Sequence, residues 1–271
     1  MASRAMAPTG MLAGLRATLE RRAGLAVPVV IVALWQVLIS VGLLHNAAIP
    51  SPITVADSLY TGLFTGHHPL FFATVTTLER LLLGYVIAVV AGAVLGMAAG
   101  RVNDLAYAIN PIVALWIPLP AIVTIPVISL WLGAGDIVIV LTVIFSAWIP
   151  VYLGAQQGAC SIGKRQLWVA RASGASGWTT FRKVIVPGAM IHMIPSLRMG
   201  LGYAWRAVIA AEIVVQQGKG LGITIFSARQ FFDVPTMYAG VVLIAILGLL
   251  LERLAFPLIE RVTIERWGLV T

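Results

Sequence analysis

The sequence predicts an all-α integral membrane protein with six transmembrane helices. Of its 271 residues, 60% are hydrophobic and only 10% are charged, and the mean hydropathy is +0.98. Soluble domains carry about 25% charged residues. Uncharged stretches of spanning length recur along the chain, since a transmembrane helix needs roughly 20 apolar residues. This composition excludes a large soluble domain, and we expect one transmembrane domain over residues 1–271.

Five uncharged stretches predict five of the spans. They cover residues 25–44, 81–100, 105–135, 137–163 and 234–251. A sixth expected span, at about 190–216, is interrupted by Arg198, Arg206 and Glu212. Charges at membrane depth are expensive and usually face a bundle interior or a wet cavity, so these three residues are candidate functional residues. Arg206 and Glu212 lie about 240° apart around a helix, so each needs a partner elsewhere.

The basic residues predict that both termini are cytoplasmic, because cationic loops stay on that side. With six spans, thirteen of the 18 Lys and Arg residues fall on one side of the membrane. Arg80 at a membrane border, Lys219 and Arg229 belong to the other side. The net charge of +8 follows from this asymmetry. A basic membrane face explains it, and nucleic acid is not an expected partner.

The chain offers no pattern typical of a secretion signal, a metal site or an active site. The apolar run at 25–44 is longer than the 7 to 15 residues of a signal-peptide core, so we expect a retained first span. Cys160 is the single cysteine, and the four histidines have no ligand spacing. No catalytic constellation and no phosphate-binding G-x-x-x-x-G-K-[ST] motif occur. We therefore expect no catalytic residue, no metal and no cofactor.

Two further segments have readable local signals. Ser51 as N-cap, Pro52 at the first helical position and Gly66 as a stop predict a short helix on the outer surface. The expected third span contains four prolines, and each removes a backbone donor that protein or water must compensate. These prolines are Pro111, Pro118, Pro120 and Pro126. The span either faces protein or a pathway, or is a kinked helix at a packing interface.

A polar, basic segment lies between the fourth and fifth uncharged regions. Residues 164–173 favour a helix, Gly174 permits a left-handed stop, Ser176 can cap a second short helix, and Pro187 marks where the next membrane element begins. Basic side chains would hold this helix pair at the cytoplasmic interface, while apolar ones need a cover. The basic residues are Arg165, Arg171, Arg182 and Lys183, and the apolar ones are Leu167, Trp168, Val169 and Phe181. The pair either packs only on its own membrane domain or projects into a partner's groove.

The stretch "VARASGASGWTTFRKVIVP" (169–187) resembles the cytoplasmic "EAA" loop of permease subunits of bacterial ATP-binding-cassette importers. Ala170 falls on the second alanine, Gly174 on the glycine and Pro187 on the closing proline, with the nine-residue gap kept. Trp168 stands where the family has its glutamate and Val169 where it has its first alanine, so the role of that glutamate is not transferred. The resemblance implies an ATPase-coupling loop at about 160–187. Its expected residues are Ala170, Arg171, Gly174, Ala175, Trp178, Arg182 and Pro187.

The similarity extends over nearly the whole chain outside the termini. "LPAIVTIPVISLWLGAGD" (119–136) and "PSLRMGLGYAWRAVIAAEIV" (195–214) are similar to segments of the subfamily that imports nitrate, taurine, alkanesulfonates, bicarbonate and pyrimidine precursors. The resemblance implies a type I importer permease in the bacterial cytoplasmic (inner) membrane. It also implies a homodimer, two cytoplasmic ATPase subunits and an extracytoplasmic solute-binding protein.

Several alternatives stay open at this point. A self-sufficient channel or secondary transporter, and an intramembrane enzyme, are the other classes of function. The solute is a small anion or a pyrimidine precursor. Glu212 either ties the fifth span to a loop or to a second subunit, or lies in the solute path, where a carboxylate would repel an anion. Arg198 can extend to the cytoplasmic surface.

Overall fold

The computed structural model describes residues 26–43, 48–65 and 69–260, with side chains up to residue 253. Every regular element in these ranges is helical, which confirms the predicted all-α class. The first is the apolar helix Ala26–Ser40. The others are α2 (Pro52–Phe64), α3 (Pro69–Ala99), α4 (Asn103–Trp116), α5 (Ala121–Leu132), α6 (Asp136–Ser161), α7 (Lys164–Ala172), α8 (Gly177–Thr180), the π-helix η1 (Phe181–Ile185), α9 (Val186–Val215), α10 (Leu221–Gln230) and α11 (Val234–Glu260).

Four helical segments of the described chain are long and apolar enough to cross a membrane. These are Pro69–Ala99, Asp136–Ser161, Gly177–Val215 and Val234–Arg253. The α4–α5 pair forms a fifth candidate if its two halves are taken as one span, and the helix Ala26–Ser40 is apolar but shorter. This set is consistent with the six expected spans.

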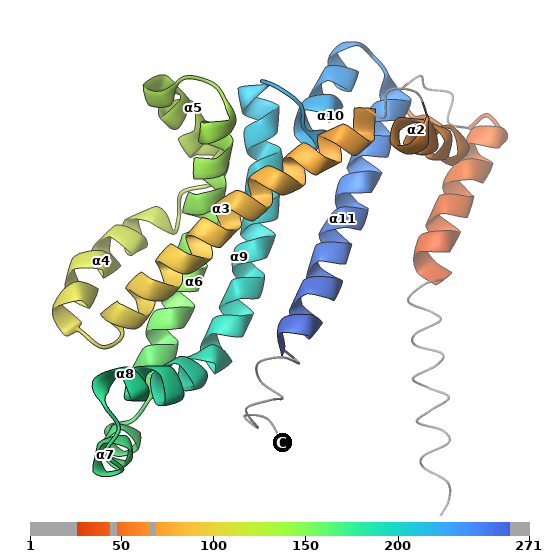
Figure 1. Ribbon diagram of the computed structural model, residues 1–271. Coiled ribbons are helices and arrows are strands. Elements are labelled where there is room, and N and C mark those ends of the chain that lie inside the picture. The colour runs from red at the N-terminus through yellow and green to blue at the C-terminus, as the bar shows by residue number, and fades with distance from the viewer. Residues whose placement is uncertain (1–25, 44–47, 66–68, 261–271) are drawn as a thin grey trace, which may run out of the picture.

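The expected third span is not one continuous helix. Its halves, α4 and α5, are bent by 104° at a short break. Pro118 and Pro120 lie in this break, where they remove backbone donors and disfavour a helical conformation at the residues before them. Pro111 and Pro126 are accommodated inside α4 and α5. Even so, the pair carries the chain from the α7–α8 end of the molecule to the α10 end (Figure 1).

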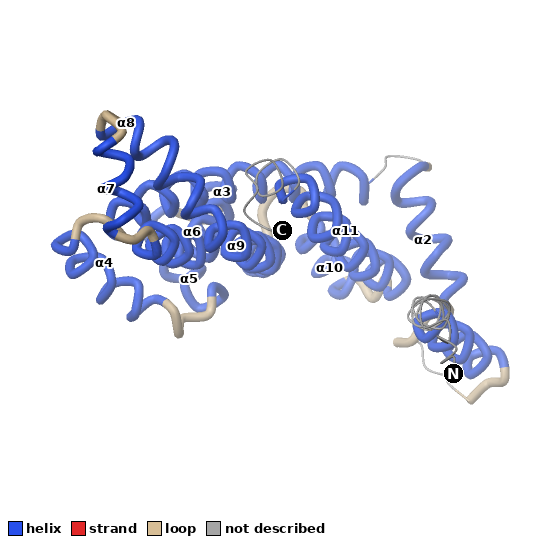
Figure 2. Tube along the Cα trace, turned by 90° about the horizontal axis from the view of Figure 1, so that it is seen from below, coloured by secondary structure: helices blue, strands red, loops and turns tan. Residues whose placement is uncertain are grey.

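The core of the molecule lies between α3, α6 and α9, which lie side by side in both views (Figure 1 and Figure 2). Its buried side chains are mostly small or branched, so the helices approach closely. A Cβ atom at Gly92 of α3 would lie 2.8 Å from the carbonyl oxygen of Trp148 on α6, and therefore only glycine fits there. Such small-residue contacts are typical of helix packing in membranes, where lipid removes the hydrophobic drive.

The short helix α2 confirms the prediction for residues 51–64. The Ser51 hydroxyl accepts a hydrogen bond of 3.1 Å from the Thr54 amide, and Pro52 begins the helix. Gly66, the expected stop, lies outside the described residues. α2 and α10 lie at the same end of the molecule, opposite α7 and α8 (Figure 1).

Candidate functional site

The helix pair at the lower end of Figure 1 extends beyond the ends of α3, α6 and α9. The turn between α7 and α8 has the conformation that the sequence predicts. Gly174 has φ +74°, the Ala175 amide donates to the Ala170 carbonyl (3.1 Å), and the Gly174 amide donates to the Arg171 carbonyl (2.9 Å). These two bonds form a Schellman motif, which fixes the angle at which the chain leaves α7. The Ser176 hydroxyl caps α8 by accepting from the Thr179 amide (3.2 Å).

The second helix of the pair differs from the expectation. α8 is not a separate short helix. It continues without a break through η1 into α9, so that one helical segment runs from Gly177 to Val215. Pro187 is the second residue of α9, at the start of the element that the sequence predicted there, and it directly follows the π-helix η1. Only α7 is therefore a separate short helix, and α8 is an extension of the span Gly177–Val215.

Apolar side chains of this region divide into an anchor and an exposed set. Leu167 is buried against Ala159, Ile162 and Ile185, with Phe181 partly buried beside them. In contrast, Trp168, Val169 and Trp178 are 71%, 60% and 70% exposed. The helix pair is thus attached to its own bundle through Leu167 and still presents uncovered aromatic surface. Of the predicted coupling residues, Arg171, Gly174, Trp178 and Arg182 are exposed, whereas Ala170, Ala175 and Pro187 are partly buried.

A buried charged cluster lies at the opposite end, where α3, α9 and α10 meet. Glu212 has no exposed surface, and its carboxylate accepts hydrogen bonds from Arg80 Nη1 (2.8 Å), Thr77 Oγ1 (2.9 Å) and the Gly222 amide (2.9 Å). The Leu221 amide donates to Thr77 Oγ1 (2.9 Å), which adds the start of α10 to the cluster. Glu212 therefore joins α9 to α3 and to the first turn of α10.

Arg80 extends this cluster toward the surface. Its Nη1 binds Glu212 and its Nη2 binds Asp136, whose side chain is 72% exposed at the start of α6. From the sequence, Arg80 was expected only at a membrane border, and nothing in the sequence identified it as the partner of Glu212. The two residues are 132 positions apart. A local pattern offers no signal for such a pair.

A pocket of about 810 Å³ lies beside the α4–α5 bend, and its walls come from α6 and α9. Along α9 its lining residues follow a spacing of three and four, which defines one face of the helix. These residues are Ser196, Met199, Tyr203, Arg206, Ala207 and Ala210. Two of the four prolines of the third segment, Pro118 and Pro120, border this pocket.

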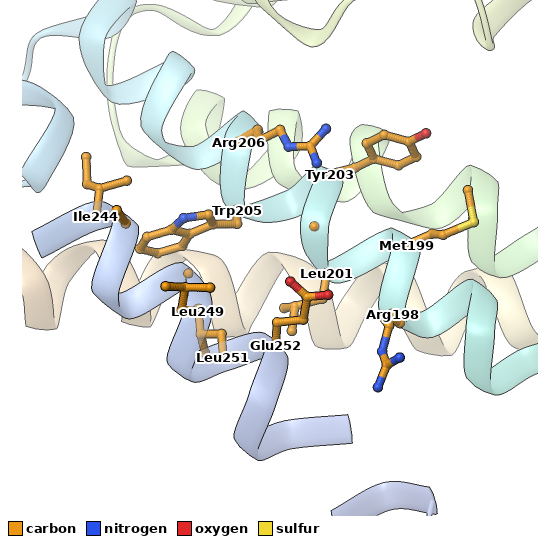
Figure 3. A pocket seen from close by; sticks show the side chains of 13 residues that line it. Arg198, Met199, Leu201, Tyr203, Trp205, Arg206, Ile244, Leu249, Leu251 and Glu252 are labelled. Carbon is orange, nitrogen blue, oxygen red and sulfur yellow. The ribbon is translucent and has the colours of Figure 1, made fainter. Parts of the chain in front are cut away.

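Arg206 lines both this pocket and a second, neighbouring groove. The groove, of about 500 Å³, runs between α9 and α11 and is also lined by Arg198 and Glu252. Figure 3 shows Arg206 and Tyr203 extending from α9, with the guanidinium turned along the helix toward Tyr203. The guanidinium carbon lies 5.8 Å from the centre of the Tyr203 ring, at cation–π distance. Within the described residues, the structure brings Arg206 and Glu212 into no common site.

Comparisons with known proteins agree with these features. Residues 80–263 match the model of the family described as "Binding-protein-dependent transport system inner membrane component". The chain is 27% identical to the putative aliphatic sulfonates transport permease protein SsuC of Bacillus subtilis, over 88% of this chain and 85% of that protein. It is 29% identical to the taurine transport system permease protein TauC of Escherichia coli, over 82% of each. It is 30% identical to the riboflavin transport system permease protein RibX of Chloroflexus aurantiacus, over 86% of this chain and 85% of that protein.

Proposed function

This chain belongs to the family of binding-protein-dependent transport system inner membrane components, and on that premise we propose that two copies of it form the path by which a small sulfonate anion enters the cell. The family places it among the multi-pass permease subunits of ATP-binding-cassette importers. Permeases of this family are transport proteins and not enzymes. An ATPase and a solute-binding protein are the partners that the family implies.

The observation that supports this function most directly is the α7–α8 helix pair. It lies beyond the bundle, its bend is fixed by the Schellman motif at Gly174, and Trp168 and Trp178 are exposed on it. We infer that an ATPase subunit binds this surface. Because α8 continues into α9, a displacement of the helix pair would act directly on the span that lines the pocket. The nucleotide state of the ATPase would then bias the dimer between inward and outward openings.

The orientation follows from the positions of the basic residues. The α7–α8 end contains Lys164, Arg165, Arg171, Arg182 and Lys183, whereas Lys219 and Arg229 lie near α10 at the other end. By the positive-inside rule the α7–α8 end faces the cytoplasm. We therefore propose that both termini are cytoplasmic, in the inner membrane of a bacterium. The α10 end would then face the solute-binding protein.

The relatives support a sulfonate as the solute. Two of those compared above are named for aliphatic sulfonates or taurine, and both solutes carry a sulfonate group. A third is named for riboflavin, so membership of the family does not by itself determine the solute. A sulfonate keeps its negative charge throughout the physiological pH range. The solute path must therefore accept an anion and avoid carboxylates, which would repel it.

We expect proteoliposomes that hold the permease with its ATPase and ATP to accumulate radiolabelled ethanesulfonate when the solute-binding protein is added outside. The physical reason is that the binding protein supplies the solute and the ATPase supplies the free energy. Liposomes without the binding protein provide the control and should show only background uptake. Uptake of riboflavin but not of ethanesulfonate, with the same dependence on the binding protein, would contradict a sulfonate as the solute.

A further inference from the structure

The pocket beside the α4–α5 bend has one charged side chain among its described lining residues, and this is Arg206. The other polar groups of the lining are weaker donors or already engaged. The hydroxyls of Thr124, Ser146 and Ser196 each donate to a carbonyl of their own helix, at 2.8, 2.8 and 3.0 Å. Most of the remaining lining is apolar. An anion in this pocket would therefore find its strongest hydrogen-bond donor in the Arg206 guanidinium.

No carboxylate of the described chain neutralises Arg206. Both ion pairs that the structure gives between two described residues involve Arg80, and they use Glu212 and Asp136. Glu212 is the carboxylate on α9, and it lies on the buried side of that helix. Glu252 lines the neighbouring groove, but it forms no ion pair with Arg206. A positive charge at membrane depth with no counterion among the described residues indicates a wet cavity or an anionic ligand.

The position of Arg206 along α9 places it well inside the membrane. It lies nine residues before the end of the helix at Val215, which corresponds to about 14 Å at 1.5 Å per residue. That distance is about half the thickness of a hydrocarbon core of about 30 Å. The cation–π contact with Tyr203 holds the guanidinium against the pocket wall. A solute whose path runs through this pocket would therefore meet this charge.

We propose that Arg206 is a solute-binding residue, and that its guanidinium binds the anionic group of the solute inside the membrane domain. This inference rests on the proposed function, because it requires a negatively charged solute. A planar guanidinium presents paired N–H donors that match two oxygens of a sulfonate. The pocket of about 810 Å³ leaves room for a small sulfonate together with water. Both the binding protein and Arg206 would then select for a negatively charged solute.

The test compares Arg206→Gln and Arg206→Lys with the parent in the complete importer. Proteoliposomes with ATPase, ATP and the binding protein are supplied with radiolabelled ethanesulfonate, and uptake and ATP hydrolysis are both measured. We expect Arg206→Gln to lower uptake at least about tenfold, since a charge-assisted hydrogen bond is lost. Stimulation of the ATPase by the loaded binding protein should stay within about twofold of the parent. Arg206→Lys should recover much of the uptake, because it keeps the charge.

Two matched variants separate this role from others. Arg253→Gln removes an exposed positive charge from α11, outside the pocket, and it should transport like the parent. If Arg206 served only to balance Glu252, the double variant Arg206→Gln/Glu252→Gln would regain normal uptake, and this would overturn the proposal. Parental uptake by Arg206→Gln would overturn it too. So would equal loss in Arg206→Gln and Arg206→Lys together with a lower melting temperature, which would indicate a structural role.

The result for Arg206 can be distinguished from the result for the solute. If the parent imports nitrate but no sulfonate, the proposed solute is wrong, and a tenfold loss of nitrate uptake in Arg206→Gln still supports the anion site. If the parent imports only riboflavin and Arg206→Gln imports it equally well, both proposals are overturned.

Discussion

Glu212→Gln should lower the free energy of unfolding by about 3–5 kcal/mol, because it removes one partner of a buried ion pair. The carboxylate is fully buried and accepts hydrogen bonds from Arg80, Thr77 and the Gly222 amide. Glutamine has no charge to offset the Arg80 guanidinium, and one of its two terminal atoms is a donor that would face other donors. The melting temperature of the purified permease in detergent is the measurement that checks this loss.

Asp136→Asn is the matched control for Glu212→Gln. It removes the other carboxylate bound to Arg80, but that carboxylate is 72% exposed. Exposed ion pairs contribute about 0–1 kcal/mol, so the melting temperature should change little. If Glu212→Gln keeps the parental melting temperature and alters the choice of solute, the carboxylate belongs to the solute path and not to a structural joint.

Gly174→Val should abolish solute-stimulated ATP hydrolysis while the permease still reaches the membrane. Gly174 has φ +74°, and a β-branched residue in this region costs about 1–3 kcal/mol locally. No atom lies within 4 Å of a Cβ built at this position, so the effect comes from the backbone conformation and not from a clash. The Schellman bend would open and change the angle between α7 and α8. The measurements are the ATPase recovered per permease on co-purification and the rate of ATP hydrolysis.

Gly174→Asn supplies the control, because asparagine adopts a positive φ more readily than other residues with a side chain. It should bind ATPase much more nearly as the parent does. The alternative, in which the helix pair only packs on its own bundle through Leu167, predicts a different pattern. Gly174→Val would then reduce the amount of permease in the membrane and leave ATPase binding per molecule unchanged.

Local sequence signals predicted much of the fold. Hydropathy identified the spanning segments, Ser51 and Pro52 identified the start of α2, and Gly174 identified the left-handed turn. Each of these features depends on interactions within a few residues. The Schellman bonds, for example, link residues 170, 171, 174 and 175. Such contacts can be read without knowledge of the tertiary structure.

Features that depend on distant contacts could not be predicted in the same way. The sequence shows that Glu212 needs a partner, but its partner Arg80 is 132 positions away. Prolines in the third segment predict that the helix is interrupted or kinked, but they do not determine the angle of 104° between α4 and α5. The continuous helical segment from Gly177 to Val215 was also missed, because a proline such as Pro187 normally marks a helix boundary and here follows the π-helix η1 without a break. The placement of Arg206 on a pocket wall required the packing of α6 against α9.

Uptake of radiolabelled ethanesulfonate by proteoliposomes under two driving forces tests the central claim most directly. One set contains the permease with its ATPase, ATP and the binding protein, and the other contains the permease alone with an imposed proton or sodium gradient. The proposed function predicts accumulation in the first set and none in the second. Accumulation driven by the ion gradient without the ATPase would contradict it and would identify a secondary transporter.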